Sequence, residues 1–379
     1  MSKLFTTYAY SESNLVRVAE NDICIDAVGN VTARVFCNAV NYECDGKGRV
    51  MRSRYNSASM DTQEYRYTWQ EKNGVNQSFV TKGKTYRSEM HTDAFGRIVS
   101  DNICVGTGNI QRDFTYLAGV KTAEHVEHGK CKSNATTDLV SKISFTDGRT
   151  ISYEYDGEDN ISKVADSSAG TTEYTYDSLG QLLTETVSGT TVNSMTYDAF
   201  GNILNKNGVV YEYDSVWKDR LVKVGNDTIT YDASGCPAMY RGFAATWQNG
   251  RMMSLGSNTY TYNCNGIRTS KTVNGVRHTY TLEGLRIVCE KWANHELVPM
   301  YDSVGSVYGI IYDDIAYYFM RNIQGDIVSV MDKDGNAVAK YAYDAWGKCT
   351  VLSDTSGCGI ANINPFRYRG YYYDAEIGL

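Results

Sequence analysis

The dipeptide Tyr-Asp returns along this chain at regular spacings, and this repeat constrains the fold more than any other feature. The first three strong copies stand 21 residues apart. Such a repeat predicts an architecture that adds one small unit to the next. The copies are Tyr155-Asp156, Tyr176-Asp177, Tyr197-Asp198, Tyr213-Asp214, Tyr231-Asp232 and Tyr343-Asp344, with a variant at Tyr262-Asn263 and weaker echoes in residues 42–46 and 91–98.

The residues before each aspartate have the periodicity of a strand. In RTISYEYD (149–156), the isoleucine and the two tyrosines alternate with serine and glutamate. Successive side chains of a strand point to opposite faces, so the aromatic groups share one face and the polar groups the other. The same alternation recurs in residues 174–176, 209–213, 260–262 and 341–343.

The aspartate is predicted to end the strand and begin a turn, because its short side chain can accept hydrogen bonds from the backbone amides just ahead. Glycine often stands at the fourth position after the tyrosine. A hairpin loop built on a type I turn needs a left-handed residue there, and glycine adopts that conformation without steric cost. These glycines are Gly180, Gly201, Gly235 and Gly347.

Asx-Gly pairs mark a second kind of connection between strands. Such pairs favour two-residue type I′ turns, so each unit is predicted to read strand, tyrosine, turn, strand, short turn. The pairs are Asp147-Gly148, Asn207-Gly208, Asn274-Gly275 and Asp334-Gly335.

Composition supports an all-β protein made of repeated antiparallel β-hairpins. The chain has 31 tyrosines, which favour strands, 34 glycines, which favour turns, and only 3 prolines. A single hairpin is barely stable in water, so each must bury its aromatic face against its neighbours. Burial of one tyrosine contributes about 4–6 kcal/mol as an upper bound. We therefore expect tyrosine rings stacked side by side to decide the architecture, with turns setting the register.

Charge and hydropathy narrow the class of partner. The net charge of −7, with scattered lysine and arginine, argues against nucleic-acid binding, which needs a positive surface. No apolar run is long enough for a membrane-spanning helix. The N-terminus, MSKLFTTYAYSESN, lacks the apolar core of a secretory signal.

The ten cysteines have wide and irregular spacings. A chain of 379 residues does not need disulfides to stabilise a small core. We therefore expect mostly unbridged, partly buried thiols.

The ordered series resembles the YD-repeat (RHS-repeat) proteins, a family that includes bacterial polymorphic toxins, the Tc-toxin cocoon and the teneurins. The stretches that carry this resemblance are WKDRLVKV (217–224), ITYDASGCP (229–237), YTYNCNGIRTSKTVNGVRHTYT (260–281), NIQGDIVSVMDKDGNAVAKYAYDAWGK (322–348) and NPFRYRGYYYDAEIGL (364–379). The last one is similar to the start of the RHS-associated core, with Pro365, Arg367, Arg369, Gly370, Tyr373, Asp374 and Gly378 as its motif residues.

The resemblance implies a β-sheet of hairpins wound spirally into a hollow shell. It divides the chain into degenerate repeats (1–149), regular repeats (150–345) and the truncated start of the RHS-associated core (346–379). In bacterial members, the shell encloses a C-terminal toxin, and the core cuts itself from that toxin. This implies a bacterial protein that is secreted or at the cell surface as part of a larger protein, and cytoplasmic before export.

The chain ends within the core motif, so the aspartates of self-cleavage and a toxin domain are not in it. We therefore assign no catalytic residue and expect no enzyme. At this length, we expect a partial or open curved sheet rather than a closed cocoon.

Other constellations have structural explanations. His125, His128 and Cys131 have ligand-like spacing but lack a fourth zinc ligand nearby. Residues 332–336 (DKDGN) resemble a calcium loop with a misplaced glycine, and a hairpin turn accounts for them. Gly106-Thr107-Gly108 lacks the third glycine of a dinucleotide site. No cofactor and no metal site are predicted, and Arg367 and Arg369 are expected to have structural roles.

Three functions remain open at this point. The first is a non-catalytic scaffold that encloses or presents a C-terminal toxin or other passenger polypeptide. The second is a cell-surface adhesin or carbohydrate-binding module, in which rows of aromatic side chains contact glycans or a cell-surface protein. The third, a self-cleaving protease or a glycosidase, has the least support, because the cleavage segment is missing.

Overall fold

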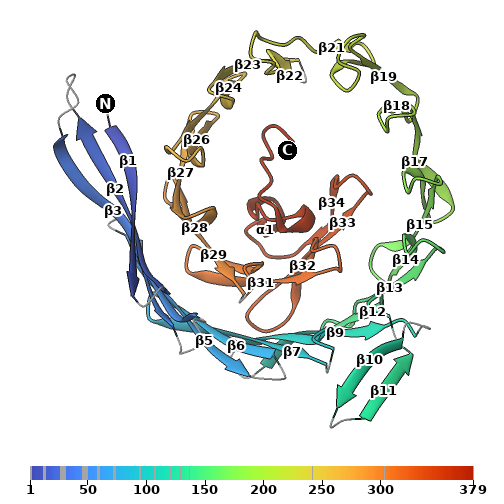
Figure 1. Cartoon of the computed structure of the whole chain (residues 1–379), viewed down its shortest axis with the longest axis horizontal. Helices are drawn as coiled ribbons and strands as arrows, with labels where there is room; N and C mark the ends of the chain where they lie inside the picture. The colour runs from blue at the N-terminus through green and yellow to red at the C-terminus, as the bar shows by residue number, and fades with distance from the viewer. Residues whose placement is uncertain are drawn as a thin grey trace. The chain divides into compact units, whose positions relative to one another are not determined.

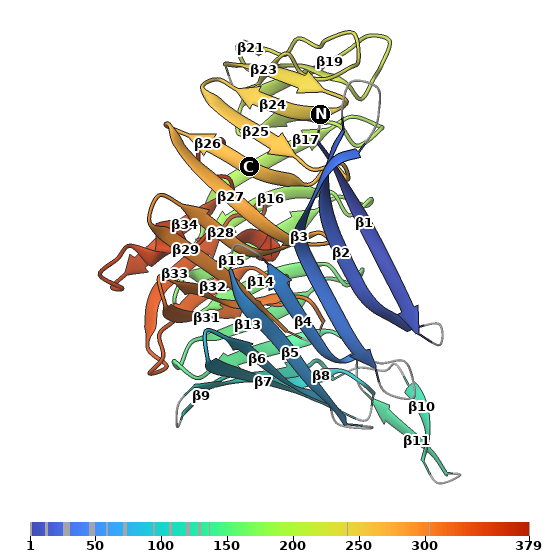
Figure 2. The same cartoon turned by 90° about the vertical axis from the view of Figure 1, so that its left-hand side faces the viewer.

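A computed structural model gives the fold of the chain (Figures 1 and 2). The structure describes residues 2–11, 14–25, 31–44, 50–57, 60–70, 74–93, 95–105, 108–118, 122–127, 130–135, 137–240, 242–302 and 304–378. The described residues form an almost entirely β structure, as the sequence predicts. Its short helical segments are α1 (Ile360–Ile363) and the 3₁₀ turn η1 (Tyr368–Gly370).

The chain divides into two compact units, each made of segments distant in sequence. Unit 1 comprises Met1–Gln111, Ser257–Phe319 and Met331–Asn336, and unit 2 comprises Arg112–Gly256, Met320–Val330 and Ala337–Leu379. This grouping reflects packing, whereas the predicted division at residues 149 and 345 reflects the regularity of the repeats. The predicted division therefore stays a prediction.

The strands that fall mostly in unit 1 are β1 (Ser2–Ser11), β2 (Asn14–Ile25), β3 (Val31–Cys44), β4 (Val50–Ser57), β5 (Met60–Gln70), β6 (Gly74–Thr81), β7 (Lys84–Thr92), β8 (Ile98–Val105), β25 (Asn258–Tyr262), β26 (Arg268–Val273), β27 (Val276–Glu283), β28 (Arg286–Trp292), β29 (His295–Tyr301), β30 (Val307–Tyr312) and β31 (Ile315–Arg321).

The strands that fall mostly in unit 2 are β9 (Gly108–Tyr116), β10 (Thr122–Glu127), β11 (Lys130–Ala135), β12 (Val140–Phe145), β13 (Thr150–Tyr155), β14 (Ile161–Asp166), β15 (Gly170–Tyr176), β16 (Leu182–Val187), β17 (Thr190–Tyr197), β18 (Ile203–Lys206), β19 (Val209–Tyr213), β20 (Leu221–Val224), β21 (Asp227–Thr228), β22 (Met239–Tyr240), β23 (Phe243–Gln248), β24 (Arg251–Leu255), β32 (Ile327–Met331), β33 (Ala337–Tyr343) and β34 (Cys349–Asp354).

Strands that follow one another along the chain pair antiparallel, and the register shifts at the tyrosine of the repeat. The shift falls between Glu154 and Tyr155, between Thr175 and Tyr176, and again just before Tyr197, Tyr213, Tyr262 and Tyr301. Each shift is a β-bulge, which bends a strand and increases its twist. Repetition at one position of each unit therefore curves the sheet in one direction.

Unit 1 has two layers that pack face to face. Buried side chains such as Phe79 of β6 and Met300 of β29 fill the space between them. Gln63 Nε2 of β5 donates to the Val288 carbonyl oxygen (3.2 Å), and Gln77 Nε2 of β6 donates to that of Tyr301. Every residue of β30 is buried, since both of its faces are covered. This unit supplies much of the protein's apolar core.

A buried carboxylate in unit 1 accepts hydrogen bonds from three arginine side chains. The Glu64 side chain accepts hydrogen bonds from Arg52 (2.8 Å), Arg54 (3.0 Å) and Arg66. Burial by itself would raise the pKa of Glu64, but the bonds from the three arginines outweigh it and lower the pKa to about 2.

This cluster predicts an acid dependence of stability. Because the pKa of Glu64 is lower in the folded state, its contribution is fully present above about pH 4.5 and is lost as the pH falls towards 2. We expect Glu64 to contribute about 2 kcal/mol at neutral pH, after allowance for the exposed arginines. Urea unfolding of wild type and Glu64→Gln at pH 7 and pH 2.5 measures this difference.

The control for this experiment is Glu43→Gln, which removes the exposed partner of Arg52. Exposed ion pairs contribute little, so this variant should keep the wild-type dependence on pH. If Glu64→Gln also kept that dependence, the cluster would not be the source of the acid sensitivity.

Unit 2 is a curved wall with its C-terminal segment on the concave side. Figure 1 shows the strands from β12 to β24 following one another around an arc, with β33, β34 and α1 inside the curve. Arg149 joins the two parts: its guanidinium forms a buried ion pair with Asp166 of the wall and donates to the carbonyl oxygen atoms of Val328 (2.6 Å) and Tyr341 (3.3 Å). The C-terminal segment is therefore anchored to the inner face of the wall.

Candidate functional site

The Tyr-Asp turns have the geometry predicted from the sequence. In the turn after Tyr176, Asp177 Oδ1 accepts the backbone amides of Leu179 and Gln181, both at 2.9 Å. Gly180 N–H donates to the Asp177 carbonyl oxygen (3.1 Å) and its φ is 75°. Asp156, Asp198, Asp232, Asp302, Asp332 and Asp344 make the same pair of side-chain bonds, as does Asn263.

The left-handed position of these turns accepts a few residue types. Gly201, Gly235 and Gly347 occupy it with φ of 87°, 80° and 83°, whereas Asp159 occupies it in the first regular repeat with φ of 66°. The loop after Tyr213 is longer, and there Asp214 Oδ1 bonds the amides of Val216 and Trp217.

The prediction of type I′ turns is right at two Asx-Gly pairs and wrong at two. Asn207-Gly208 and Asn274-Gly275 both have positive φ at the two residues, as a type I′ turn requires. In Asp147-Gly148 and Asp334-Gly335, only the glycine has positive φ. These two pairs close longer loops, in which Gly148 N–H bonds the Phe145 carbonyl oxygen and Gly335 N–H bonds that of Asp332.

Gly235 offers a test of the turn, because no atom outside its own backbone neighbourhood lies within 4 Å of a Cβ added there. Only backbone strain then opposes a larger residue. We expect Gly235→Ala to lower the free energy of unfolding by about 1 kcal/mol. Gly235→Asn should cost less, since asparagine tolerates the left-handed conformation that Asp159 adopts. Chemical denaturation measures both, and equal losses for the two variants would contradict this account of the turn.

The tyrosine of each repeat links its hairpin to the preceding one through its hydroxyl group. Tyr176 Oη donates to the Ile161 carbonyl oxygen (2.8 Å), and Tyr197 Oη to that of Leu182 (2.7 Å). The acceptor is the first residue of the strand that follows the previous turn. The same bond joins Tyr155 to Val140, Tyr213 to Ile203, Tyr231 to Leu221 and Tyr343 to Ile327.

The expectation that tyrosine rings stack side by side is wrong for the tyrosines of the regular repeats. Tyr155, Tyr176, Tyr197 and Tyr213 are half-buried, and none of these rings stacks on another ring. Burial raises the pKa of all four phenols. The hydroxyl group of each of these tyrosines, and not ring stacking, makes the contact with the neighbouring strand.

Tyr197 and Tyr211 form a matched pair for testing this link. Both are half-buried in adjacent repeats, but only Tyr197 donates a hydrogen bond to the protein. We expect Tyr197→Phe to lower the free energy of unfolding by about 1 kcal/mol, because the Leu182 carbonyl group loses its partner. Tyr211→Phe should have a smaller effect in the same denaturation experiment. A greater loss from Tyr211→Phe would argue against the hydroxyl link.

The C-terminal segment brings the motif residues 365–378 into one compact structure. Pro365 is buried, and its carbonyl oxygen accepts Tyr373 N–H (2.7 Å). Gly370, with φ of 70°, donates to the Arg367 carbonyl oxygen (3.2 Å). Asp374 accepts backbone bonds from Ile377 and Gly378. Backbone hydrogen bonds among these residues therefore form a series of turns.

Arg367 is the centre of this segment. Its guanidinium is buried, donates to the carbonyl oxygen atoms of Ala361, Asn362 and Asn364, and lies 4.9 Å from the ring centroid of Tyr373. Arg369 holds the segment to the inner layer, since its backbone N–H donates to Asp326 Oδ1 (2.7 Å). The structural roles predicted for the two arginine side chains stay a prediction.

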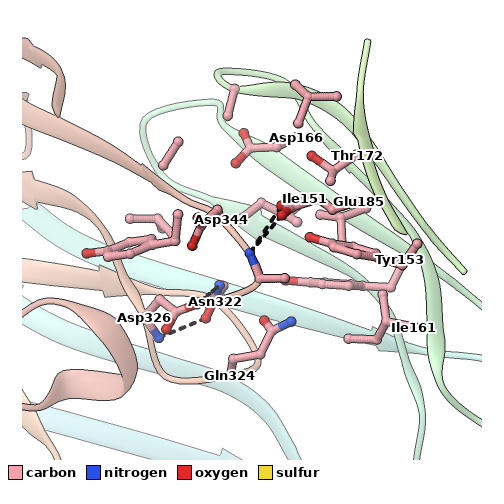
Figure 3. Close-up of a pocket in the computed structure, with 18 of the residues that line it drawn as sticks. Ile151, Tyr153, Ile161, Asp166, Thr172, Glu185, Asn322, Gln324, Asp326 and Asp344 are labelled. Carbon is pink, nitrogen blue, oxygen red and sulfur yellow. Dashed lines mark hydrogen bonds between the residues drawn. The ribbon is translucent and has the colours of Figure 1, made fainter. Parts of the chain in front are cut away.

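A cavity of about 560 Å³ lies between the wall of unit 2 and its inner layer (Figure 3). Strands β13 to β17 line one side, with Tyr153, Tyr174 and Glu185 among their residues. The turns at residues 322–326 and 344–348, together with Arg369, line the other side. We take this cavity as the candidate site.

The polar lining of the cavity includes four carboxylates, those of Asp166, Glu185, Asp326 and Asp344. Glu185 is buried and accepts the Ala345 amide (3.1 Å) and Asn193 Nδ2 (2.6 Å). Asp326 is also buried, and burial raises its pKa, although bonds from Asn322 and Arg369 oppose this effect. Sequence reasoning missed Glu185, Asp326 and Arg149, because no local pattern shows which residues distant in sequence face one another.

The other sequence predictions fall in three groups. Cys44, Cys104, Cys236, Cys289 and Cys349 are unbridged thiols, as expected. The side chains of His125, His128 and Cys131, and residues Gly106 and Thr107 of the Gly-Thr-Gly stretch, lie outside the described residues. Residues 332–336 form the predicted hairpin turn. Within the part of the chain that the structure describes, no helix is long and apolar enough to span a membrane, and no three His, Cys, Asp or Glu side chains gather as metal ligands.

A wall of bulged antiparallel hairpins, closed by Asx turns and linked by tyrosine hydroxyl groups, defines a YD-repeat shell protein. Residues 136–379 match the family described as Teneurin YD-shell, and the chain belongs to this family. The resemblance inferred from the repeat is therefore confirmed.

Among curated proteins, the chain is similar to the tRNA3(Ser)-specific nuclease WapA of Bacillus spizizenii, with 32% identity over 174 residues, and to the tRNA nuclease WapA of Bacillus subtilis, with 33% identity over 174 residues. Each alignment covers 42% of this chain and 7% of the relative. The chain therefore corresponds to a small part of these nucleases.

Two solved structures share the fold. The crystal structure of TcdB2-TccC3-TEV has a TM-score of 0.57, and the Photorhabdus luminescens Tc holotoxin pore has one of 0.54. Each is 13% identical, and each match covers 98% of this chain and 24% of the other chain. At this level of identity, the likeness shows the fold.

Proposed function

We propose that this chain is a non-catalytic shell segment of a larger bacterial protein, and that it encloses or presents a passenger polypeptide. The observation that carries the proposal is the position of residues 346–378, which lie on the concave side of the unit 2 wall (Figure 1). A polypeptide joined to this segment would start on the inner face.

The fold supplies a steric mechanism for this function. The wall is held by bonds between hairpins. Arg149 ties β32 and β33 to the wall, and Arg367 holds the C-terminal segment together through bonds to its carbonyl groups. A passenger on the inner face is shielded from solvent and proteases by the wall alone, so no reaction is required. We propose a secreted or cell-surface location as part of the larger protein.

The tyrosines of the repeats give the adhesin alternative little support. Their hydroxyl groups are engaged with backbone carbonyl groups, and their rings are half-buried. They are therefore not arranged as an open platform for sugar rings.

A protease-protection experiment tests the proposed function. A short flexible peptide with a cleavage site free of basic residues is appended to the C-terminus, and the same peptide is inserted between Ala233 and Ser234 in an exposed turn. We expect the C-terminal site to be cleaved at least about tenfold more slowly, because the protease must reach the inner face. Equal rates at the two positions would contradict the proposal.

A second variant links protection to the docked segment. Arg367→Ala removes the contacts that fasten residues 361–364. The C-terminal site should then be cleaved faster than in wild type, with the rate in the turn at residues 233–234 unchanged. Cleavage that stays slow in this variant would argue against docking as the cause of protection.

A further inference from the structure

Three successive turns on one rim of the unit 2 wall carry apolar side chains that are largely exposed. They are the turns at residues 177–181, 198–202 and 214–220, which follow β15, β17 and β19. Single exposed apolar residues are normal on a protein surface, whereas a contiguous group marks an interaction site. The four side chains, which we call the apolar row, are those of Leu179 (75% exposed), Phe200 (81%), Val216 (79%) and Trp217 (64%).

The three turns touch one another, so the apolar row is one continuous feature. A Cβ added to Gly201 would lie 2.9 Å from Nε2 of Gln181, which ends the preceding turn. Asn202 Nδ2 donates to the Lys218 carbonyl oxygen of the following turn (3.2 Å). Turns on one rim of an antiparallel sheet are two strands apart, about 9–10 Å. The row therefore extends over about 19 Å of the rim.

The turn itself does not need an apolar residue at this position. Leu179, Phe200 and Val216 each stand two residues after the aspartate of their turn. The equivalent position holds Ser234 in one turn and Glu158 in another, and the amide of each makes the same bond to its aspartate. Formation of the turn therefore does not account for the apolar side chains, whereas burial against a partner does.

The backbone of the apolar row is fixed by its own turns. Asp198 Oδ1 accepts the amide of Phe200 (2.8 Å). Asp214 Oδ1 accepts the amide of Trp217 (2.8 Å). The guanidinium carbon of Arg220 lies 5.6 Å from the ring centroid of Trp217 and helps to hold this ring. A preformed surface of this kind loses little conformational entropy on association.

The apolar row is complementary to a second copy of itself. A two-fold axis that runs radially through the turn of Phe200 maps the curved rim onto itself, so that the two arcs keep the same curvature (Figure 1). Phe200 then meets its own symmetry copy. Leu179, on one side of the axis, meets Val216 and Trp217 of the second copy.

The exposed area is enough for a weak dimer. An aromatic side chain buries about 150–250 Å² when it is fully covered, so the four side chains present on the order of 500 Å² per copy. Two copies would together bury about 1,000 Å², which is near the lower limit for a specific interface. We therefore expect a dissociation constant on the order of 10 μM.

We propose that the apolar row is the contact surface of a homodimer, in which two copies of this chain meet rim to rim about a two-fold axis at Phe200. The curved walls of the two copies then continue across the interface, since the axis keeps both arcs on one circle. This inference goes beyond the enclosure of a passenger and rests only on the rim of unit 2.

Sedimentation velocity of the full chain tests the proposal. Wild type should pass from monomer to dimer between about 1 and 100 μM. Phe200→Ser should raise the dissociation constant at least about tenfold. This variant should fold, because Ser234 occupies the same position in an equivalent turn. A wild-type chain that stays monomeric over this range, or a Phe200→Ser variant that dimerises as tightly as wild type, would overturn the proposal.

Leu285→Ser is the matched control, since Leu285 is equally exposed (81%) but belongs to unit 1. It should leave the dissociation constant of the dimer unchanged. A loss as great as that of Phe200→Ser would show a general effect of surface hydrophobicity and contradict the assignment to the apolar row.

Oxidative cross-linking tests the position of the axis. Phe200→Cys should form a disulfide between two copies, above the background that the chain's own thiols give in wild type. Leu179→Cys should not, because each Leu179 faces Trp217 of the second copy. Equal cross-linking of the two variants would overturn the two-fold arrangement. These experiments involve no passenger and no protease, so dimerisation and enclosure can fail separately.

Discussion

The structure depends on one repeated hydrogen bond, from a tyrosine hydroxyl group to a backbone carbonyl group of the preceding hairpin. A single hairpin has little stability of its own, so the chain needs a contact that each new unit makes with the last. The Tyr-Asp dipeptide supplies it: the aspartate closes the turn of its own hairpin, and the tyrosine holds the previous one. Two adjacent residues thus set both the geometry of the turn and the attachment of one hairpin to the preceding one.

The position of this bond also accounts for the curvature of the unit 2 wall. The register shift falls at the tyrosine in successive hairpins, with the extra residue in the strand opposite, so the bend accumulates in one direction. A curved wall has a concave face. Arg149 ties β32 and β33 to that face, and the core-motif segment is held to this inner layer by backbone bonds of Arg367 with Ile327 and of Arg369 with Asp326. The concave face therefore follows from the same repeat that links the hairpins of the wall.

Much of the fold could be predicted because the repeat is local. Strand alternation, the Asx turn and the left-handed glycines are all properties of a few consecutive residues, and the sequence displays them. The role of the tyrosine hydroxyl group was missed, because its acceptor is a backbone carbonyl group of another strand, and the alternation of residue types does not show which carbonyl group a side chain reaches. The cavity was missed for another reason: Glu185 and Asp326 lie far apart in the sequence, and only the packing of unit 2 brings them to the same cavity.

Native-state hydrogen exchange tests the central claim most directly, since it reports whether neighbouring hairpins open together. If the hydroxyl links couple the repeats, the amides of β13 to β18 should exchange in wild type with one common free energy of opening. In a variant with Tyr155, Tyr176 and Tyr197 all changed to phenylalanine, the hairpins should open separately and at lower free energies. A common free energy of opening that persists in this variant would contradict the account.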